Sequence, residues 1–284
     1  MKCQPESLTL NCGGSLLSLS QPIVMGILNT TPDSFFSESR ATTERTIKER
    51  ASNIITEGAG IIDIGACSTR PFAAEVTETE ELQRMRQALR FVREELPDAI
   101  LSVDTFRASI ARMSVEEFGA AIVNDVSGGD ADADMYATVA RLKVAYVCMH
   151  MQGTPQTMQL APTYTHIVGD VITDLSRKVE ALRSLGVKDI IIDPGFGFGK
   201  TLEQNYMLLK QLDAFHIFGL PLLAGVSRKS MIHKLLNVST ADSLNGTTVV
   251  NTLALSKGAH ILRVHDVKAA CEAIRITSYM HNID

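Results

Sequence analysis

The sequence predicts an α/β fold, a (β/α)8 TIM barrel with an N-terminal β-hairpin covering the bottom of the barrel. Eight short apolar runs recur along the 284 residues, without the apolar/polar alternation of a half-exposed sheet. Such runs suit strands buried on both faces, as in parallel sheets covered by helices. The segments between most of them have helical periodicity, which right-handed crossovers between parallel strands require.

Nearly every expected strand stops at, or a few residues before, a side chain that can hydrogen-bond, bind metal or carry charge. The eight runs are residues 23–28, 61–65, 100–103, 121–123, 144–149, 190–192, 222–226 and 261–262. Eight strand–helix units in about 260 residues match the usual size of a closed barrel. An open doubly wound sheet would show the same alternation, but no glycine-rich dinucleotide fingerprint follows the first run.

The expected helices follow from apolar stripes at helical spacing. Ile47, Ala51 and Ile54 share one stripe, and Gly58 stands where a C-terminal cap belongs. A second stripe contains Leu82, Met85, Leu89 and Val92, and it follows a Thr77-to-Glu80 segment with capping-box spacing. Later helices are expected over residues 109–118, 167–184, 202–212, 244–256 and 267–279.

Residues 8–19, with Gly13-Gly14 at the centre, predict the hairpin ahead of the first barrel strand. With 45% hydrophobic and 21% charged residues, the chain can bury one large core, so a single domain over residues 1–284 is expected. The net charge of -5 gives no general basic field for nucleic acid.

No apolar stretch approaches the roughly 20 residues that a membrane helix needs, and residues 1–6 lack a signal-peptide core. Five scattered cysteines without paired metal spacing fit reduced thiols. We therefore expect a cytoplasmic protein that binds neither membrane nor nucleic acid.

Two partial motifs predict nothing. Gly199-Lys200-Thr201 resembles the end of a P-loop, but Pro194 stands where that motif needs its first glycine. Residues 130–134 copy the first half of a calcium loop, yet Met135 replaces the required glycine and Arg141 the terminal carboxylate. The second stretch is expected to be a solvated loop.

The polar side chains at the strand ends should meet at one mouth of the barrel, where such folds carry their catalytic residues. Arg263 and His265 follow the eighth run, beside Asn29 after the first. Arginine binds phosphate oxygens through two parallel donors, and a neutral amide oxygen suits a magnesium ion that also takes phosphate ligands. This half of the mouth favours a polyphosphate.

The other half favours a polar heterocycle. Asp104, Asn124 and Asp193 follow the third, fourth and sixth runs, and they match the donor and acceptor edge of a ring. Lys229 can donate to a ring carbonyl or nitrogen, while Val126, Met149 and Phe198 can wall the ring faces.

Each of these residues also has a simpler explanation. A lone Asp or Asn at a strand end is about as often a loop cap as a ligand, and Arg263 can pair with an acidic residue on the rim. We expect His150 to be a structural hydrogen-bonding histidine, because nothing nearby in the sequence marks it as a base.

Eight motifs, in order from about residue 23 to residue 267, resemble dihydropteroate synthases. They are Ile27-Leu28-Asn29-Thr30-Thr31-Pro32-Asp33-Ser34-Phe35-Phe36, Ser68-Thr69-Arg70-Pro71, Ser102-Val103-Asp104-Thr105, Asn124-Asp125-Val126-Ser127-Gly128-Gly129, Met149-His150-Met151-Gln152-Gly153-Thr154-Pro155, Asp193-Pro194-Gly195-Phe196-Gly197-Phe198-Gly199-Lys200, Ser227-Arg228-Lys229-Ser230 and Arg263-Val264-His265-Asp266.

The resemblance implies a transferase of folate biosynthesis, a pterin-binding TIM barrel and sulfonamide target. It would condense (7,8-dihydropterin-6-yl)methyl diphosphate with 4-aminobenzoate, giving 7,8-dihydropteroate and diphosphate, with Mg2+ as cofactor and in a homodimer. The implied residues are Asn29 for the metal; Asp104, Asn124, Val126, Met149, Asp193, Phe198, Lys229 and Arg263 for the pterin; Thr69, Arg263 and His265 for the diphosphate; Phe35, Thr69, Arg70, Pro71, Phe198 and Ser230 for 4-aminobenzoate; and Asp33, Lys229 and Arg263 for catalysis.

One departure from the family pattern is visible. The family more often has Gly-Gly-Glu before Ser-Thr-Arg-Pro and a glycine after it, whereas this chain has Gly65-Ala66-Cys67 and then Phe72. Phenylalanine in place of glycine restricts the backbone and adds bulk beside the expected aminobenzoate entrance.

Three rival hypotheses share part of this pattern. A pterin-dependent methyltransferase would use the pocket carboxylates without a metal at Asn29. A class I aldolase would use Lys229 as a Schiff base, and borohydride would trap the adduct. A noncatalytic pterin-binding paralogue would bind the pterin and release no diphosphate.

Overall fold

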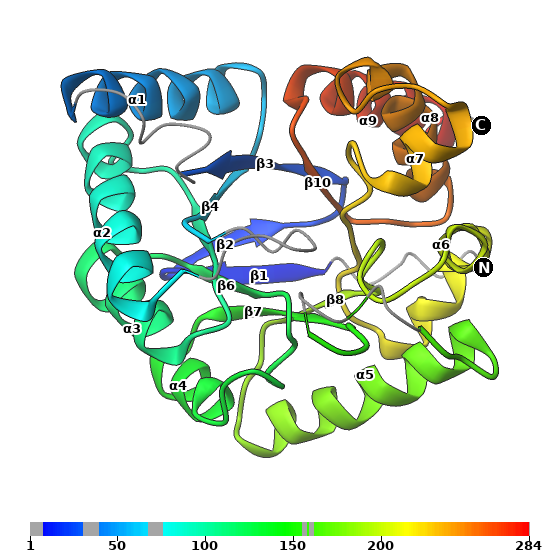
Figure 1. Cartoon of the computed structure of the whole chain (residues 1–284), viewed down its shortest axis with the longest axis horizontal. Helices are drawn as coiled ribbons and strands as arrows, with labels where there is room; N and C mark the ends of the chain where they lie inside the picture. Colours follow the sequence, from blue (N-terminus) through cyan, green and yellow to red (C-terminus); the bar gives the residue numbers. More distant parts are fainter. Residues whose placement is uncertain (1–7, 31–39, 68–75, 155–157, 159–161, 284) are drawn as a thin grey trace.

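The structure is a computed structural model that describes residues 8–30, 40–67, 76–154, 158 and 162–283. Eight parallel strands form one sheet in the order β8-β7-β6-β5-β4-β3-β10-β9. A parallel bridge between Ile192 and Leu222 joins β8 to β9. The sheet therefore closes into a barrel, and the predicted fold class is confirmed (Figure 1).

The barrel strands lie within one or two residues of most of the predicted runs. They are β3 (Ile23–Asn29), β4 (Ile61–Gly65), β5 (Leu101–Asp104), β6 (Ile122–Asp125), β7 (Ala145–Met149), β8 (Ile190–Asp193), β9 (Leu223–Ala224) and β10 (Ile261–Val264). The strand β9 has only two residues and ends at Ala224, two residues before the predicted end at Val226.

Helices surround the barrel in Figure 1, most of them connecting one strand to the next. They are α1 (Arg40–Thr56), α2 (Glu78–Glu95), α3 (Ala108–Phe118), α4 (Met135–Leu142), α5 (Ile167–Ser184), α6 (Leu202–Lys210), α7 (Ser230–Leu236), α8 (Leu244–Ser256) and α9 (Val267–His281), with 3-10 helices η2 (Leu212–Phe218) and η3 (Ala241–Ser243). Helices α4 and α7 were not predicted, because eight and seven residues are too few to show an apolar stripe.

The expected helix caps form in part. Thr77 caps α2 by accepting a hydrogen bond from the Glu80 amide. Thr201 and Gln204 make the full reciprocal capping box, at the start of α6. That cap lies immediately after Lys200, so the helix start fixes the end of the loop that follows β8.

The predicted hairpin is present and closes the bottom of the barrel. Strands β1 (Thr9–Cys12) and β2 (Ser15–Ser18) pair antiparallel through a turn at Gly13-Gly14, where both glycines have positive φ. Leu10 and Leu19 are buried against inward-facing residues near the start of the barrel strands. The Asn11 amide also donates to Asp189 Oδ1, just before β8, at 3.0 Å.

The barrel interior changes character along the strands. Its lower layer is apolar and contains Met25, Ile61, Ile122, Ile191, Leu223 and Ile261. Two residues further along, where the strand geometry turns the side chain to the same face, the residues are Ile27, Asp63, Asn124, Asp193, Gly225 and Arg263. A polar layer therefore lies directly above the apolar one, toward the carboxyl ends of the strands.

The outer core lies between the strands and the helices. Ile62 and Ile64 of β4 pack outward in the same cluster as Ile54 of α1 and Met85 of α2. Among the helices that the structure describes, none is long and apolar enough to cross a membrane.

Candidate active site

Arg263 is the centre of the polar layer. Its Nε donates to Asp63 Oδ2 at 2.6 Å, and its Nη2 donates to Asp104 Oδ2 at 2.6 Å. Its side chain is 19% exposed, so both ion pairs are largely shielded from water. The pairing draws Arg263 toward the predicted heterocycle half of the mouth, beside Asp104.

Asp63 is a site residue that the sequence reasoning missed. It is fully buried on β4, where its Oδ1 accepts from Ser102 Oγ at 2.6 Å and its Oδ2 accepts from Asn124 Nδ2 at 3.1 Å. The available signal was an aspartate inside the otherwise apolar run 61–65, since a charged residue there is costly unless it has partners. Asp63 connects β4 to β5, β6 and β10.

Asp104 ends β5 and is 8% exposed. Burial raises the pKa of its carboxyl to about 7, while the charge of Arg263 opposes that rise and Asp63 adds to it. A carboxyl that titrates near neutrality in a barrel mouth is typical of a ligand-binding or catalytic group. Its Oδ1 makes no hydrogen bond to a residue that the structure describes.

Asp193 and Lys229 form a second charged group across the mouth. Asp193 ends β8, and its Oδ1 accepts from the Gly195 amide at 2.8 Å. A Cβ on Gly225 would lie 3.9 Å from both Asp193 Oδ2 and Lys229 Nζ, so the two charges face each other past this glycine. Burial raises the pKa of Asp193 and lowers that of Lys229 to about 8.

Lys229 also fixes the aromatic wall of the site. Its ammonium donates to the Phe196 carbonyl and lies 4.5 Å from the centroid of the Phe198 ring. A cation at this distance from a ring face is attracted by the ring's electrons. Phe198 is thus held beside Lys229 in the loop after β8.

Asn29, the last residue of β3, lies beside Asp104 across Gly65. A Cβ on Gly65 would approach Asn29 Oδ1 to 3.3 Å and Asp104 Oδ2 to 3.7 Å, so glycine leaves room for both side chains. The described residues contain no cluster of three or more His, Cys, Asp or Glu that could hold a metal ion. The Asn29 amide oxygen has the chemistry of a magnesium ligand for an ion that would receive its other ligands from phosphate and water.

The rim after β10 is tied to the loop after β9. His265 Nδ1 lies 3.1 Å from Ser227 Oγ, and Ser227 Oγ also accepts from the His265 amide at 3.2 Å. Arg228, which has a positive φ of 54°, makes two hydrogen bonds of 2.8 Å to Asp266. Ser230, predicted to contact 4-aminobenzoate, is exposed at the first position of α7.

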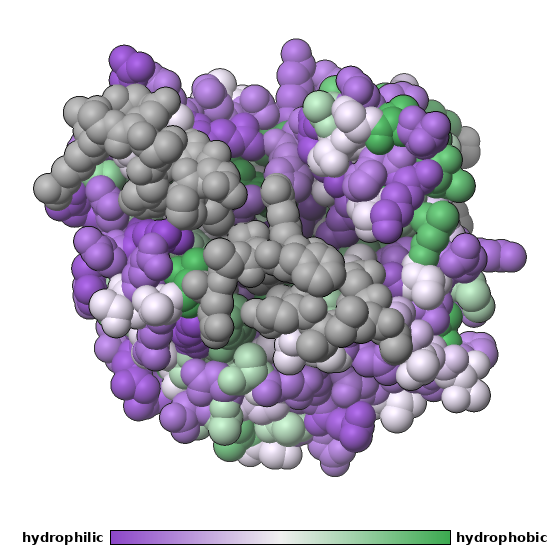
Figure 2. Space-filling view, in the orientation of Figure 1, coloured by the Kyte–Doolittle hydropathy of each residue, from purple (hydrophilic) through white to green (hydrophobic). Residues whose placement is uncertain are grey.

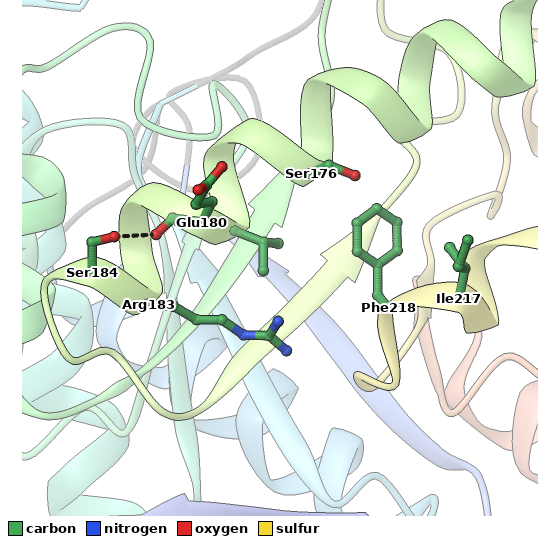
Figure 3. A pocket seen from close by; sticks show the side chains of 7 residues that line it. Ser176, Glu180, Arg183, Ser184, Ile217 and Phe218 are labelled. Atoms are coloured by element: carbon green, nitrogen blue, oxygen red, sulfur yellow. Dashed lines mark hydrogen bonds between the residues drawn. The ribbon is translucent and has the colours of Figure 1, made fainter.

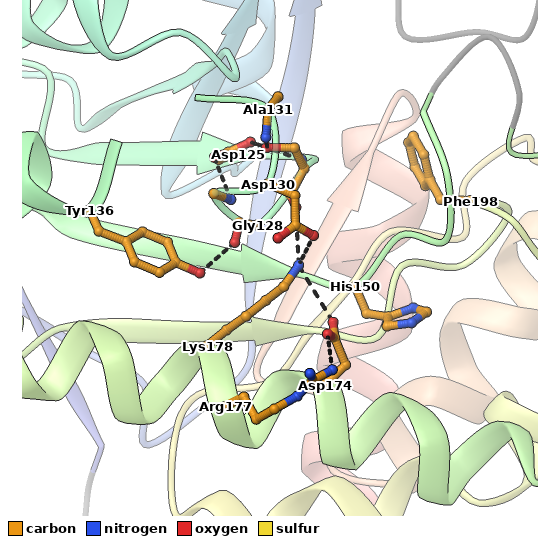
Figure 4. Close-up of polar contacts among 12 residues, drawn as sticks. Asp125, Gly128, Asp130, Ala131, Tyr136, His150, Asp174, Arg177, Lys178 and Phe198 are labelled. Carbon is orange, nitrogen blue, oxygen red and sulfur yellow. Dashed lines mark hydrogen bonds and ion pairs between the residues drawn. The ribbon is translucent and has the colours of Figure 1, made fainter. Parts of the chain in front are cut away.

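The loop after β6 is held in place by hydrogen bonds of the buried Asp125 and by Lys178 of α5. Asp125 is fully buried and accepts from the Ser127 and Gly129 amides at 2.8 and 2.9 Å and from Tyr146 OH at 2.8 Å. Lys178 reaches from α5 to donate to Asp130 Oδ2 at 2.7 Å, as Figure 4 shows. Val126 is buried at the start of this loop.

Residues 130–134, whose sequence resembles the first half of a calcium loop, connect the loop after β6 to two helices. Asp130 pairs with Lys178, and Asp132 Oδ2 accepts from the Ala108 amide at 2.8 Å at the start of α3. Residues 130, 131, 133 and 134 are exposed, so the expected solvated loop is confirmed, and the two carboxylates also hold this loop against α3 and α5.

Lys200, the lysine of the partial P-loop motif, is buried and stabilises the loop after β8 by hydrogen bonds. It is 3% exposed and donates to the carbonyls of Gly195 and Phe198 at 2.8 and 2.9 Å. Its Nζ also lies 3.0 Å from His150 Nδ1. Burial lowers the pKa of His150 to about 2, so His150 is neutral and accepts from Lys200, as expected for a structural histidine.

Some predicted residues fall outside this description. Asp33, Phe35, Thr69, Arg70 and Pro71 lie outside the described residues, as does Phe72. Cys67, where the family more often has glutamate, is half-buried after β4, and burial raises the pKa of its thiol to about 11. Met149 ends β7 and is 2% exposed, so it packs into the barrel near the mouth.

An open groove of about 470 Å³ lies elsewhere on the surface, between α5 and η2. Val179, Arg183, Ile217 and Phe218 line it, and none of the predicted site residues does (Figure 3). Both bordering segments run toward the starts of the next strands, so the groove lies on the side of the barrel bottom.

Comparison with known proteins agrees with this geometry. The pattern of the pterin binding enzyme family matches residues 25–265. Dihydropteroate synthase of Escherichia coli (strain K12) is 42% identical over 265 residues, which cover 93% of each chain.

Solved structures show the same barrel. Dihydropteroate synthase of Xanthomonas albilineans, with 4-aminobenzoic acid, superposes with a TM-score of 0.90 at 36% identity, covering 98% of this chain and 100% of that one. The same enzyme in complex with 7,8-dihydropteroate gives a TM-score of 0.87 at 34% identity, with the same coverage. The chain therefore belongs to the dihydropteroate synthase family, a family of pterin-binding transferases of folate biosynthesis.

Proposed function

We propose that this protein condenses (7,8-dihydropterin-6-yl)methyl diphosphate with 4-aminobenzoate to give 7,8-dihydropteroate and diphosphate. The observation that carries the proposal is the polar layer at the barrel mouth. Asp104, Asn124 and Asp193 converge there with Lys229 and Arg263, and their pairing leaves oxygens directed at no described residue. A pterin presents ring N–H donors and a ring carbonyl that match carboxylates and a lysine.

In the proposed reaction the amine nitrogen of 4-aminobenzoate forms a bond to the pterin methylene carbon. The carbon–oxygen bond to diphosphate breaks, its electron pair leaves with diphosphate, and the amine proton passes to solvent or to the leaving group. Positive charge develops at the methylene carbon, and the buried carboxylates Asp104 and Asp193 favour it. The aromatic amine is neutral at pH 7, so no covalent enzyme intermediate is needed.

The rim supplies the opposite charge. We assign Thr69, Arg263 and His265 to the diphosphate and Asn29 to Mg2+, which when bound would neutralise the leaving group. Ser227 orients the His265 ring beside this position through the 3.1 Å contact. Asp33 would face the developing cation, and Phe35, Arg70, Pro71, Phe198 and Ser230 would border 4-aminobenzoate.

The test is an assay of purified protein with the pterin diphosphate, 4-aminobenzoate and magnesium, following dihydropteroate by chromatography. We expect product only when all three are present, and its loss on chelation of the metal. Pterin binding without product would instead identify a noncatalytic pterin-binding protein, and transfer of a methyl group to the same pocket's ligand would identify a methyltransferase. Either result would contradict the proposal.

We also propose a homodimer formed through α8 and α9. On α8, Val250 and Leu255 are buried in the core, whereas Val249 and Leu253 are 51% and 48% exposed. Ile276 and Tyr279 of α9 are 70% and 73% exposed, and apolar residues gather over these helices in Figure 2. An apolar patch on adjacent helices is typical of a protein interface.

Light scattering tests the dimer. The expected mass is twice the 30.9 kDa of one chain. Leu253→Glu should halve that mass, whereas Leu185→Glu, at a 51% exposed position after α5, should leave it unchanged. A monomeric wild-type protein would contradict the interface.

The free cysteines Cys12, Cys148 and Cys271 support action in a reducing compartment, which we propose to be the cytoplasm.

A further inference from the structure

Asp63 lies inside β4 and contacts two residues that we assign to the pterin, Asn124 and Arg263. It is fully buried, and its strand neighbour in register is Ser102 on β5. Ser102 Oγ occupies its Oδ1, and Arg263 Nε and Asn124 Nδ2 share its Oδ2. All its partners are donors, so Asp63 is a positioning residue that does not itself reach a ligand.

The consequence is sharpest at Asn124. A carboxamide offers a donor at one end and an acceptor at the other, and only the donor end can face a carboxylate. With Nδ2 directed at Asp63, Asn124 Oδ1 faces away and makes no hydrogen bond to a described residue. A flipped amide would place two oxygens together beside a buried charge.

With the carboxyls ionised, the oxygens that remain for a ligand are therefore all acceptors. Asp104 uses Oδ2 for Arg263, and Asp193 uses Oδ1 for the Gly195 amide, which leaves one oxygen of each. Asn124 pairs in register with Asp104 on the neighbouring strand, so its oxygen joins this set. Three acceptors around one pocket select a ligand whose edge carries several N–H donors.

We propose that Asp63 sets the donor–acceptor selectivity of the pocket by locking the Asn124 amide with its oxygen toward the heterocycle. This inference rests on the proposed pterin site and adds a specificity-determining residue to it. The chemistry selected is a ring with adjacent amino and ring N–H donors, as in the aminopyrimidine half of a pterin. Rings that carry carbonyl oxygens at those positions would be rejected.

An exchange of the two side chains tests the proposal. Asp63→Asn removes the carboxylate that holds the amide, and titration calorimetry with a phosphate-free 6-hydroxymethylpterin should show binding at least tenfold weaker. Adding Asn124→Asp restores one amide beside one carboxylate with the total charge unchanged, but the amide nitrogen introduced at position 63 then also faces Arg263 Nε, which donates to the same position. The double variant should therefore regain at least threefold of the lost affinity without reaching the wild-type value, and this rescue measures coupling between the two sites.

Ser102→Ala is the matched control, because it removes another donor from Asp63 without touching Asn124. Its affinity should stay within threefold of wild type. An unrescued double variant whose thermal unfolding matches wild type would overturn the proposal, as would an Asp63→Asn protein that binds normally. If Asp63→Asn alone does not fold, Asn124→Asp compared with the double variant makes the same test.

The second readout is selectivity. Asp63→Asn should lower the preference for the pterin over its 2,4-dioxo analogue, which carries a carbonyl where the pterin has its amino group. A merely structural defect would weaken both ligands equally and would overturn the proposal. Failure of the wild-type protein to bind the pterin would refute the proposed function, whereas normal wild-type binding with no effect of the exchange refutes only this inference.

Discussion

The barrel interior contains an apolar layer of side chains at the bottom and a polar layer two residues further along the strands. At the bottom, Ile61, Ile122 and Ile261 pack with Leu10 and Leu19 of the hairpin. Two positions further along those three strands are Asp63, Asn124 and Arg263. The strands β4, β6 and β10 therefore change from apolar to polar interior side chains within two residues, whereas β3 keeps an apolar residue, Ile27, at that level.

The difference shows how stability and binding are divided. Each fully buried apolar side chain at the bottom stabilises the fold by about 1.5–3 kcal/mol. At the mouth, burial raises the pKa of Asp104 and Asp193 and lowers that of Lys229. These shifts mean that burial disfavours the charged forms, so the polar layer costs the fold desolvation energy. We infer that the bottom stabilises the barrel and the mouth serves the ligand.

The largest expected effect on stability comes from the mouth, through the ion pairs of Arg263. Arg263→Met would leave Asp63 and Asp104 buried without their cation, and removing one partner of such a pair costs about 3–5 kcal/mol. Urea unfolding should show this loss at pH 8 and a smaller one at pH 5, where the Asp104 carboxyl, whose pKa is raised to about 7, is protonated. The exposed Arg183→Met should change the unfolding free energy by less than about 0.5 kcal/mol. Equal results for the two arginines would show that the Arg263 pairs contribute nothing.

The next effect belongs to the bottom. Leu10 is 1% exposed, and Leu10→Ala should lower the unfolding free energy by about 2–5 kcal/mol through lost burial and a cavity. The pterin affinity of the folded protein should not change, because the hairpin lies at the opposite end. Leu16→Ala, in the same hairpin but 74% exposed, is the control and should be near neutral. A weakened ligand affinity in Leu10→Ala would contradict the separation of the two ends.

A smaller effect is the pH dependence of stability. Because the folded-state pKa of Asp104 is raised to about 7, the folded protein binds more protons than the unfolded chain between about pH 4 and 7. Its unfolding free energy should therefore fall as pH rises through that window, by at most about 1.4 kcal/mol per unit from this group. Asp104→Asn should reduce the slope. An unchanged slope would show that Asp104 does not titrate there.

Much of the fold was predictable because barrel strands and long helices leave strong periodic signals. Helices α5 and α8 begin and end at the predicted residues 167, 184, 244 and 256. Strand β9 and helices α4 and α7 were poorly predicted or missed, since two to eight residues carry too little pattern.

The site was predictable where a polar residue ends a strand, as with Asn29 and Asp193. Asp63 lies inside its run, so only its pairing with residues 39, 61 and 200 positions away reveals its task. The pairing of Arg263 with Asp63 and Asp104 was also hidden, because sequence position gives the strand end but not the direction of a long side chain. The structural role of Lys200 could not be predicted either, because its partial P-loop motif gave no information about its four neutral hydrogen-bonding partners.

The most direct test of the mouth as the ligand site is a calorimetric titration of a phosphate-free pterin into Asp193→Asn. Asparagine keeps Oδ1 for the Gly195 amide and replaces the ligand-facing oxygen by a donor. We predict a folded protein whose binding is weaker by about 1–3 kcal/mol, roughly 5- to 150-fold. An affinity within threefold of wild type would contradict the assignment of the polar layer to the pterin.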